Sequence, residues 1–105
     1  MSMTVVVTRN VSMRVRGFLA SAMLELASGT YSAPRISPAV RERLRTVLED
    51  WIANEADASV IMLWQERGMP GGQAVRMLGS PPIDLVDLNG IVLAKRRIAP
   101  SGANQ

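Results

Sequence analysis

The stretch "VVVTRNVSMRVRG", Val5 to Gly17, decides the fold, because it changes from a strand pattern to a helix pattern within a few residues. The β-branched run Thr4–Thr8 favours a strand, since stiff branched side chains pack well on a pleated sheet. Ser12 then stands where a helix N-cap is expected. The junction holds three arginines with no acid among them: Arg9, Arg14 and Arg16. This pattern predicts a strand-to-helix junction that offers positive charge to an anion.

Two amphipathic helices are predicted from apolar residues that recur with a period near 3.6. The first follows Ser12, and Gly29 is placed to stop it as a left-handed C-terminal residue. Its stripe is Val15, Phe18, Leu19, Ala22, Met23 and Leu26. The second begins with the cap-then-proline pair Ser37 and Pro38 and runs to about Asn54. Its stripe is Val40, Leu44, Val47, Leu48, Trp51 and Ile52.

Further strands are predicted between and after these helices. "TYSAPRI", Thr30–Ile36, reads as a short edge strand limited by Pro34. The apolar run Ser59–Gln65 predicts a strand covered on at least one face. The turn "GMPGG" leads into Gln73–Gly79, the expected return strand of a hairpin. Residues Ile83–Arg97 add further strand material near the end of the chain.

The order of these elements predicts an α+β fold, a ferredoxin-like βαββαβ sandwich with an extra C-terminal strand. Thr4–Thr8 and Ser59–Gln65, the most apolar strands, are expected at its centre. The terminal strands have no slot in a four-stranded sheet, so we expect them to pair with another subunit of a homodimer. One domain is predicted over residues 1–98, with a disordered tail over residues 99–105.

Composition excludes several classes of protein. No apolar run approaches the roughly 20 residues of a membrane span, and the start lacks a signal peptide pattern, so we expect a soluble, cytoplasmic protein with no membrane contact. The absence of Cys and His removes disulfides, imidazole triads and the usual zinc sites. All but one of the 12 Lys and Arg residues are Arg, which binds phosphate oxygens in a bidentate way. Codon composition explains that count equally well, so the local clusters carry more weight.

Several short segments stand in an order and at a spacing that make a specific match. They are "MSMTVVVTRNV", Arg14 to Gly17, "LE" at Leu24 and Glu25, "SGTYS", "SVIMLW" and "DLNGIVL". Together they resemble the small core protein of CRISPR adaptation, the non-integrase partner of the Cas integrase, in its type I-E branch. The resemblance covers about residues 1–98. It implies a ferredoxin-like homodimer that sits between two integrase dimers, exchanges its C-terminal strands, and carries duplex DNA over its flat top.

The same resemblance raises the question of catalysis, because the family is also assigned metal-dependent endonuclease activity on RNA or DNA. Arg9 stands where the acidic residue of that activity would sit. A guanidinium repels Mg²⁺, which needs carboxylate oxygens. Other acids, Asp84 with Asp87 and Glu55 with Asp57, are interpreted as surface or turn residues because no third ligand is apparent. We therefore predict no catalytic residue, metal ligand or cofactor, and keep a Mg²⁺-dependent endonuclease as the alternative.

The predicted nucleic-acid contacts are Arg9, Arg14, Arg16 and Arg76. The resemblance implies DNA contact for the two arginines at the helix start, where free backbone N–H groups also favour an anion. A solvated basic helix start is the alternative. The branch can carry two arginines where this chain has Pro82 and Ile83, so Arg76 is the expected substitute and Arg67 a weaker one. The segment Lys95–Arg97 suits DNA or an acidic patch on the integrase equally well.

These observations predict a non-catalytic scaffold of CRISPR spacer acquisition that binds duplex DNA through its phosphates and bridges integrase dimers. A third interpretation is a purely protein-binding dimer whose arginines are merely solvated. Trp51 and Trp64 fall on apolar stripes and are expected in the core rather than as platforms for base stacking.

Overall fold

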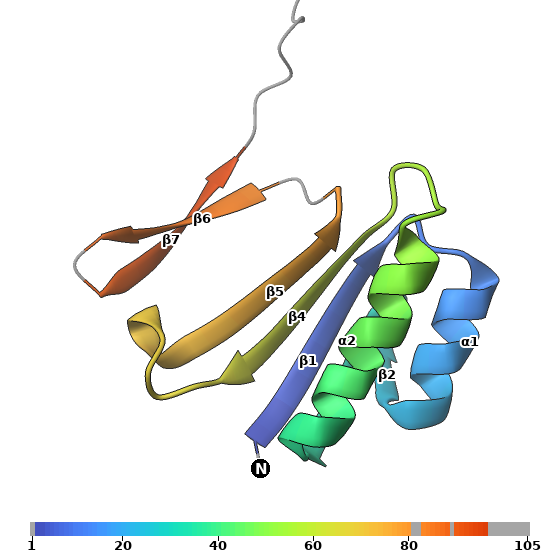
Figure 1. The fold of residues 1–105 in the computed structure, drawn as a ribbon, viewed down its shortest axis with the longest axis horizontal. Coiled ribbons are helices and arrows are strands. Elements are labelled where there is room, and N and C mark those ends of the chain that lie inside the picture. The colour runs from blue at the N-terminus through green and yellow to red at the C-terminus, as the bar shows by residue number, and fades with distance from the viewer. Residues whose placement is uncertain (1, 81–82, 89, 97–105) are drawn as a thin grey trace, which may run out of the picture.

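A five-stranded antiparallel sheet lies at the centre of the computed structural model, which describes residues 2–80, 83–88 and 90–96 (Figure 1). The strand order is β2-β3-β1-β4-β5. The strands are β1 (Ser2–Arg9), β2 (Leu24–Ala27), β3 (Thr30–Ile36), β4 (Ser59–Gln65) and β5 (Gln73–Gly79). This order is that of a ferredoxin-like α+β fold with β5 added beyond β4, so the predicted fold class and the central places of β1 and β4 are confirmed.

Two helices, α1 (Met13–Ala22) and α2 (Pro38–Ile52), lie on one face of the sheet (Figure 1). Side chains alternate between the two faces of a strand. In β1, Thr4 and Val6 are fully buried beneath the helices, whereas Met3 and Val7 remain 54% and 37% exposed on the other face. The core between helices and sheet includes Val15, Leu19, Tyr31, Leu48, Val60 and Met62. We call the sheet face without helices the open face.

The start of α2 follows its predicted signals. The Ser37 hydroxyl accepts a hydrogen bond from the backbone N–H of Val40 at 3.2 Å, and Pro38 occupies the first helical position. The helix ends at Ile52, two residues before the predicted end. Both helices within the described ranges are too short and too polar to cross a bilayer.

The predicted end of the first helix is wrong. We expected the helix to continue through Leu26 to Gly29, but α1 ends at Ala22, and the next residues form β2 against β3. Met23 caps α1 and is buried in the core, as its place on the stripe predicts, whereas Leu26 fits the helical period by coincidence and is 62% exposed. Gly29 does adopt a left-handed conformation, with φ of 80°, but it does so in the turn between β2 and β3.

The predicted edge position of β3 is also wrong, since β2 covers its outer side and takes the edge. β3 nevertheless tolerates Pro34. On one side, β2 pairs with β3 only as far as Ser32, and on the other side the register between β3 and β1 shifts between Ala33 and Ile36. Neither neighbouring strand therefore has a register partner at Pro34. A proline without an N–H donor fits such a gap.

The predicted terminal strand material forms two strands. β6 (Ile83–Leu88) and β7 (Ile91–Arg96) pair with each other in a separate two-stranded sheet. A short 3-10 turn, η1 (Pro70–Gly72), contacts β7, and Figure 1 shows the hairpin beside β5. Pairing of these strands with a second subunit stays a prediction. The predicted tail over residues 99–105 lies outside the described residues.

Candidate nucleic-acid interface

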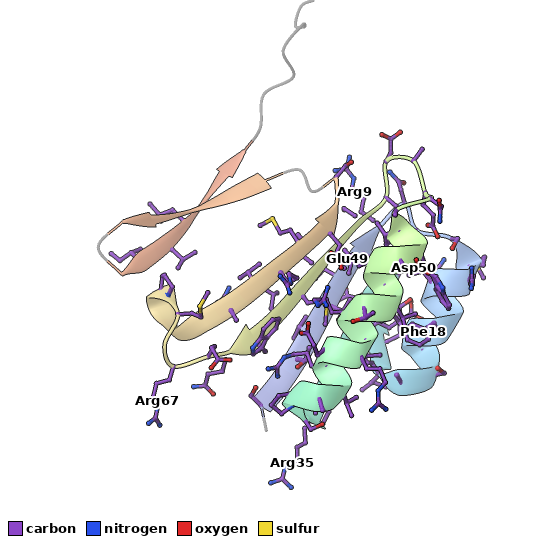
Figure 2. The ribbon with its side chains drawn as sticks, viewed as in Figure 1. Arg9, Phe18, Arg35, Glu49, Asp50 and Arg67 are labelled. Carbon is purple, nitrogen blue, oxygen red and sulfur yellow. The ribbon has the colours of Figure 1, made fainter. Side chains whose placement is uncertain are left out.

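Three of the four predicted contact residues lie at one end of the sheet. Arg9 is the last residue of β1, and α1 begins four residues later, so Arg14 and Arg16 lie in its first turn and a half. The side chain of Arg9 is exposed. Figure 2 shows it at the end of the sheet where the loop between α2 and β4 projects. The strand-to-helix junction therefore presents three cations close together in the chain.

The N-terminus of α1 is closed by an acid from a distant part of the chain. The Ser12 hydroxyl accepts from the Val15 N–H at 3.3 Å, which confirms Ser12 as the N-cap. The Glu55 carboxylate accepts from the Ser12 N–H at 2.8 Å and from the Ser12 hydroxyl at 2.7 Å. A negative charge there is stabilised by the helix dipole. We interpreted Glu55 as a solvated residue and expected the helix end to attract an external anion, but this carboxylate occupies the position.

Arg14 lies against an aromatic pair that joins the two helices. The carbon at the centre of its guanidinium is 3.8 Å from the centroid of the Trp51 ring. Phe18 meets the same tryptophan edge to face, with ring centroids 5.2 Å apart. Trp51 packs partly buried against the core, as predicted, but its remaining surface supports a cation.

Arg16 points to the other side of α1 and meets an acid. Its guanidinium lies 3.6 Å from the Glu25 carboxylate, and the adjacent Tyr31 hydroxyl and then this carboxylate raise the pKa of Arg16. The pKa of Glu25 is lowered, chiefly because its carboxylate accepts the Gly29 N–H at 3.1 Å. Within the described part of the chain, the buried Tyr31 hydroxyl has no hydrogen-bond partner, so its influence on Arg16 is that of a neighbouring dipole. Arg16 also lines a hollow of about 230 Å³ with Thr8, Asn10 and Ser28.

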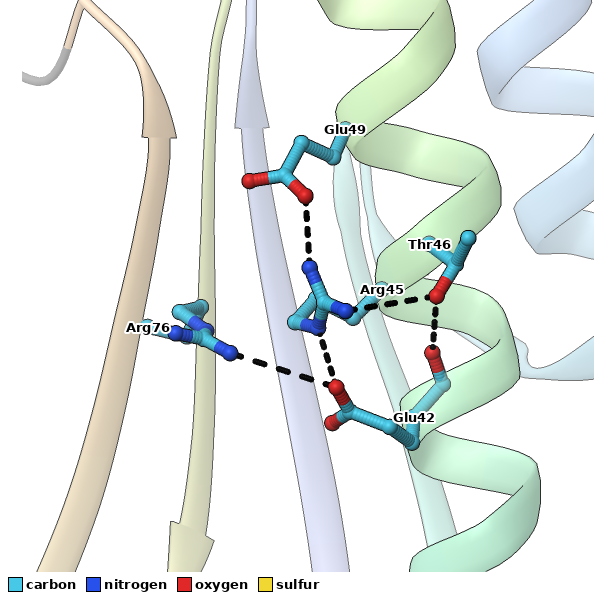
Figure 3. A network of polar contacts seen from close by, with 5 residues as sticks. All are labelled: Glu42, Arg45, Thr46, Glu49 and Arg76. Carbon is cyan, nitrogen blue, oxygen red and sulfur yellow. Dashed lines mark hydrogen bonds and ion pairs between the residues drawn. The ribbon is translucent and has the colours of Figure 1, made fainter.

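Arg76 lies apart from the other three. It sits on β5, and in Figure 1 α2 lies between β5 and α1. Its guanidinium is 4.0 Å from Glu42, which also accepts from Arg45 at 2.5 Å (Figure 3). Arg45 reaches Glu49 as well, at 2.6 Å. Arg76 is thus partly engaged by an acidic helix face, and its side chain is still 48% exposed.

The weaker candidates do not join the junction. Figure 2 shows Arg67 at the opposite end of the sheet from Arg9. The side chains of Lys95 to Arg97 lie outside the described residues.

The comparison with known families decides the affiliation of the chain. The model of a family described as "CRISPR-associated protein (Cas_Cas2CT1978)" matches residues 3–93. The chain belongs to this CRISPR-associated, Cas2-type family. No curated protein matches it significantly. The match covers both helices, all five strands of the main sheet and part of the terminal hairpin.

In this Cas2-type chain the end of β1 offers a cation to the open face. Arg9 pairs with Ser59 at the last rung of the ladder and shares the face of Val5 and Val7. Among the residues whose side chains are described, no three acids lie close enough together to hold a metal ion. The side chains of Asp84 and Asp87 lie outside that description.

The open face of this Cas2-type chain is apolar. Its exposed and half-buried apolar residues come mainly from β1, β4 and β5, with the exposed Leu24 added from β2. They include Met3, Val5, Val7, Ile61, Leu63, Val75 and Met77. A contiguous apolar surface of this kind is typical of a protein interface.

Proposed function

We propose that this chain is a non-catalytic scaffold of CRISPR spacer acquisition, a homodimer that binds duplex DNA through its phosphates and bridges integrase dimers. The observation that carries the proposal is the gathering of Arg9, Arg14 and Arg16 at one end of the sheet. The helix end between them is already occupied by Glu55. Because the Glu55 carboxylate already places a negative charge at this end of α1, a phosphate would be met chiefly by arginine side chains.

Recognition of this kind reads the DNA backbone and not its bases. Guanidinium groups hold phosphate oxygens with two parallel hydrogen bonds, and they carry no information about base sequence. Neutralising phosphates releases counterions, so the affinity falls steeply with salt. We expect weak binding by the isolated protein, because Glu25 and Glu55 lie beside these cations and offset part of their charge.

The open face supports the homodimer. Exposed apolar side chains on β1 and half-buried ones on β4 and β5 gain by burial against a second copy. Arg9 shares this face, so each subunit would bring a guanidinium toward the interface where the resemblance implies an acid. Repulsion between that charge and Mg²⁺ disfavours nuclease chemistry there.

Duplex binding is tested by measuring the dissociation constant at several salt concentrations with fluorescence anisotropy. Replacing both Arg14 and Arg16 by Ala should lower the slope of log K against log salt by about 0.9 for each lost phosphate contact. Arg35→Ala is the matched control, because Figure 2 shows Arg35 at the opposite end of the molecule from Arg9. An unchanged slope in the double variant refutes the assignment of these contacts.

The alternative, a Mg²⁺-dependent endonuclease acting on RNA or DNA, is tested with the same protein. Duplex DNA and single-stranded RNA are incubated with Mg²⁺ or EDTA and examined on denaturing gels. Intact substrate in both conditions supports the scaffold. Mg²⁺-dependent cleavage that co-purifies with the protein through every column refutes it.

The homodimer is tested by the mass in solution. Val7→Lys places a charge on the open face and should yield a folded monomer by light scattering. Val40→Lys is the control, since Val40 is similarly exposed, at 41%, but lies on α2. A Val7→Lys variant that remains dimeric would exclude the open face as the interface.

A further inference from the structure

The two arginines of α1 are held in different ways. Among the residues that the structure describes, Arg16 forms an ion pair with Glu25, whereas no acid forms one with Arg14. Arg14 instead lies over the Trp51 ring at 3.8 Å. Its positive charge is therefore less neutralised than that of Arg16.

The tryptophan beneath Arg14 is itself fixed. Trp51 is the second-last residue of α2, packs partly buried against the core, and receives the edge of Phe18 from α1. Aromatic pairs at this separation favour such an edge-to-face arrangement. The ring therefore provides a firm surface on which the flexible arginine side chain can rest.

Stacking leaves the hydrogen-bonding capacity of the guanidinium free. The group is planar and donates its five N–H bonds within its plane, so a ring that covers one face blocks none of them. We propose that Trp51 is a positioning residue, which holds the Arg14 guanidinium preformed as the fork for one DNA phosphate. This inference rests on the proposed function, and it adds a residue that touches no nucleic acid itself.

The expected gain follows from the ordering of a long side chain. An arginine that must be immobilised on binding lowers affinity by roughly two- to tenfold relative to one that is already held. Loss of the Trp51 ring should therefore weaken duplex binding within this range. The number of phosphates neutralised stays the same, so the salt slope should not change.

The decisive experiment is a double-mutant cycle on duplex binding, with Trp51→Leu, Arg14→Ala and the double variant in the full chain. Trp51→Leu should weaken binding within that range at an unchanged salt slope. It should have no further effect when Arg14 is already Ala. Trp51→Phe keeps an aromatic face and should restore part of the affinity. Equal weakening by Trp51→Leu in both backgrounds would overturn the proposal, because it would show a structural role unrelated to Arg14.

A matched control uses the second stacked arginine of the molecule. Arg41 lies over Trp64 at 4.2 Å, and Trp64 is on β4 rather than at the junction. Trp64→Leu should leave duplex affinity unchanged once both variants are shown to be folded by thermal unfolding. A loss equal to that of Trp51→Leu would mean that any weakening of the core reduces binding, and it would overturn the proposal.

A second readout separates this inference from the proposed function. In the ¹⁵N-labelled protein without DNA, the ring current of Trp51 should shift the side-chain Nε–H proton of Arg14 upfield, and Trp51→Leu should abolish the shift. Inorganic pyrophosphate should perturb this signal at lower concentration in the wild type than in Trp51→Leu. If these two results hold but the protein does not bind duplex DNA, the proposed scaffold function is refuted, and the positioning of Arg14 by Trp51 is still supported. An absent ring-current shift, or equal pyrophosphate responses, overturns the inference.

Discussion

Replacing Glu55 by Ala should change stability and DNA binding in opposite directions. The carboxylate accepts two hydrogen bonds from Ser12, at 2.8 and 2.7 Å, and closes the N-terminus of α1. Hydrogen bonds to charged groups contribute roughly 1.5–3 kcal/mol each, and partial solvent access favours the low end, so the two bonds together should contribute about 3 kcal/mol. For a domain of this size, that loss lowers the melting temperature by about 15 °C.

The effect on binding follows from charge. Glu55 is a negative charge beside the junction arginines, so its removal should raise duplex affinity at low salt, and the gain should shrink as salt screens it. Thermal unfolding followed by circular dichroism measures the first effect, and anisotropy titrations measure the second. Asp50→Ala is the control for stability, because it removes an exposed acid of α2 and leaves the hydrogen bonds between Glu55 and Ser12 at the N-terminus of α1 in place. A melting temperature equal to that of Asp50→Ala, or a fall in duplex affinity, would refute the reasoning.

Three further predictions concern other parts of the molecule. Gly79→Ala should cost at least about 3 kcal/mol in urea unfolding, because Gly79 has φ of 78° and an added Cβ would strike the Ala58 carbonyl oxygen; wild-type stability would contradict this. The pKa of Glu25 is lowered in the folded state, chiefly by the Gly29 N–H. Its stabilising contribution is therefore complete above the ordinary value of 4.5 and is lost as pH falls through the folded pKa. Glu25→Gln should flatten the decline of melting temperature below that pH, and a parallel decline in both proteins would argue against it. Arg76→Ala should lower the salt slope of duplex binding by less than the loss of a junction arginine does, because Glu42 offsets part of the charge of Arg76. A fall in slope of about 0.9, the value for one full phosphate contact, would show that Glu42 offsets none of it.

Local sequence signals predict those parts of the fold that depend on local structure. Ser37 and Pro38 start α2 because capping and a fixed φ act within a few residues. The apolar run Ser59–Gln65 forms β4 beside β1 because burial on a sheet selects such residues. The same local period misleads after Met23, where the pairing of Leu24 and Glu25 with β3 outweighs the continuing helical pattern.

The candidate site was predictable only in part. The clustering of Arg9, Arg14 and Arg16 is visible in the chain, because these residues are neighbours in sequence. The contacts of Glu55 with Ser12 join residues 43 positions apart, and so they arise only when α2 and the following loop pack against α1. No spacing rule connects such residues, although an acid in the loop after a helix can serve as the partner of a distant N-cap.

The central place of β1 sets the order in which the sheet can be completed during synthesis. β3, which pairs with one edge of β1, is synthesised after one helix and one short strand. The other edge of β1 pairs with β4, where Arg9 lies opposite Ser59 and Thr4 opposite Trp64, so this edge stays unpaired until β4 has been synthesised. At the roughly 5–20 residues per second of a ribosome, β1 has an open edge for some seconds. Exposed β-branched edges template aggregation. A nascent chain that stalls before β4 would therefore associate through Val5–Val7, the residues at the middle of the finished sheet.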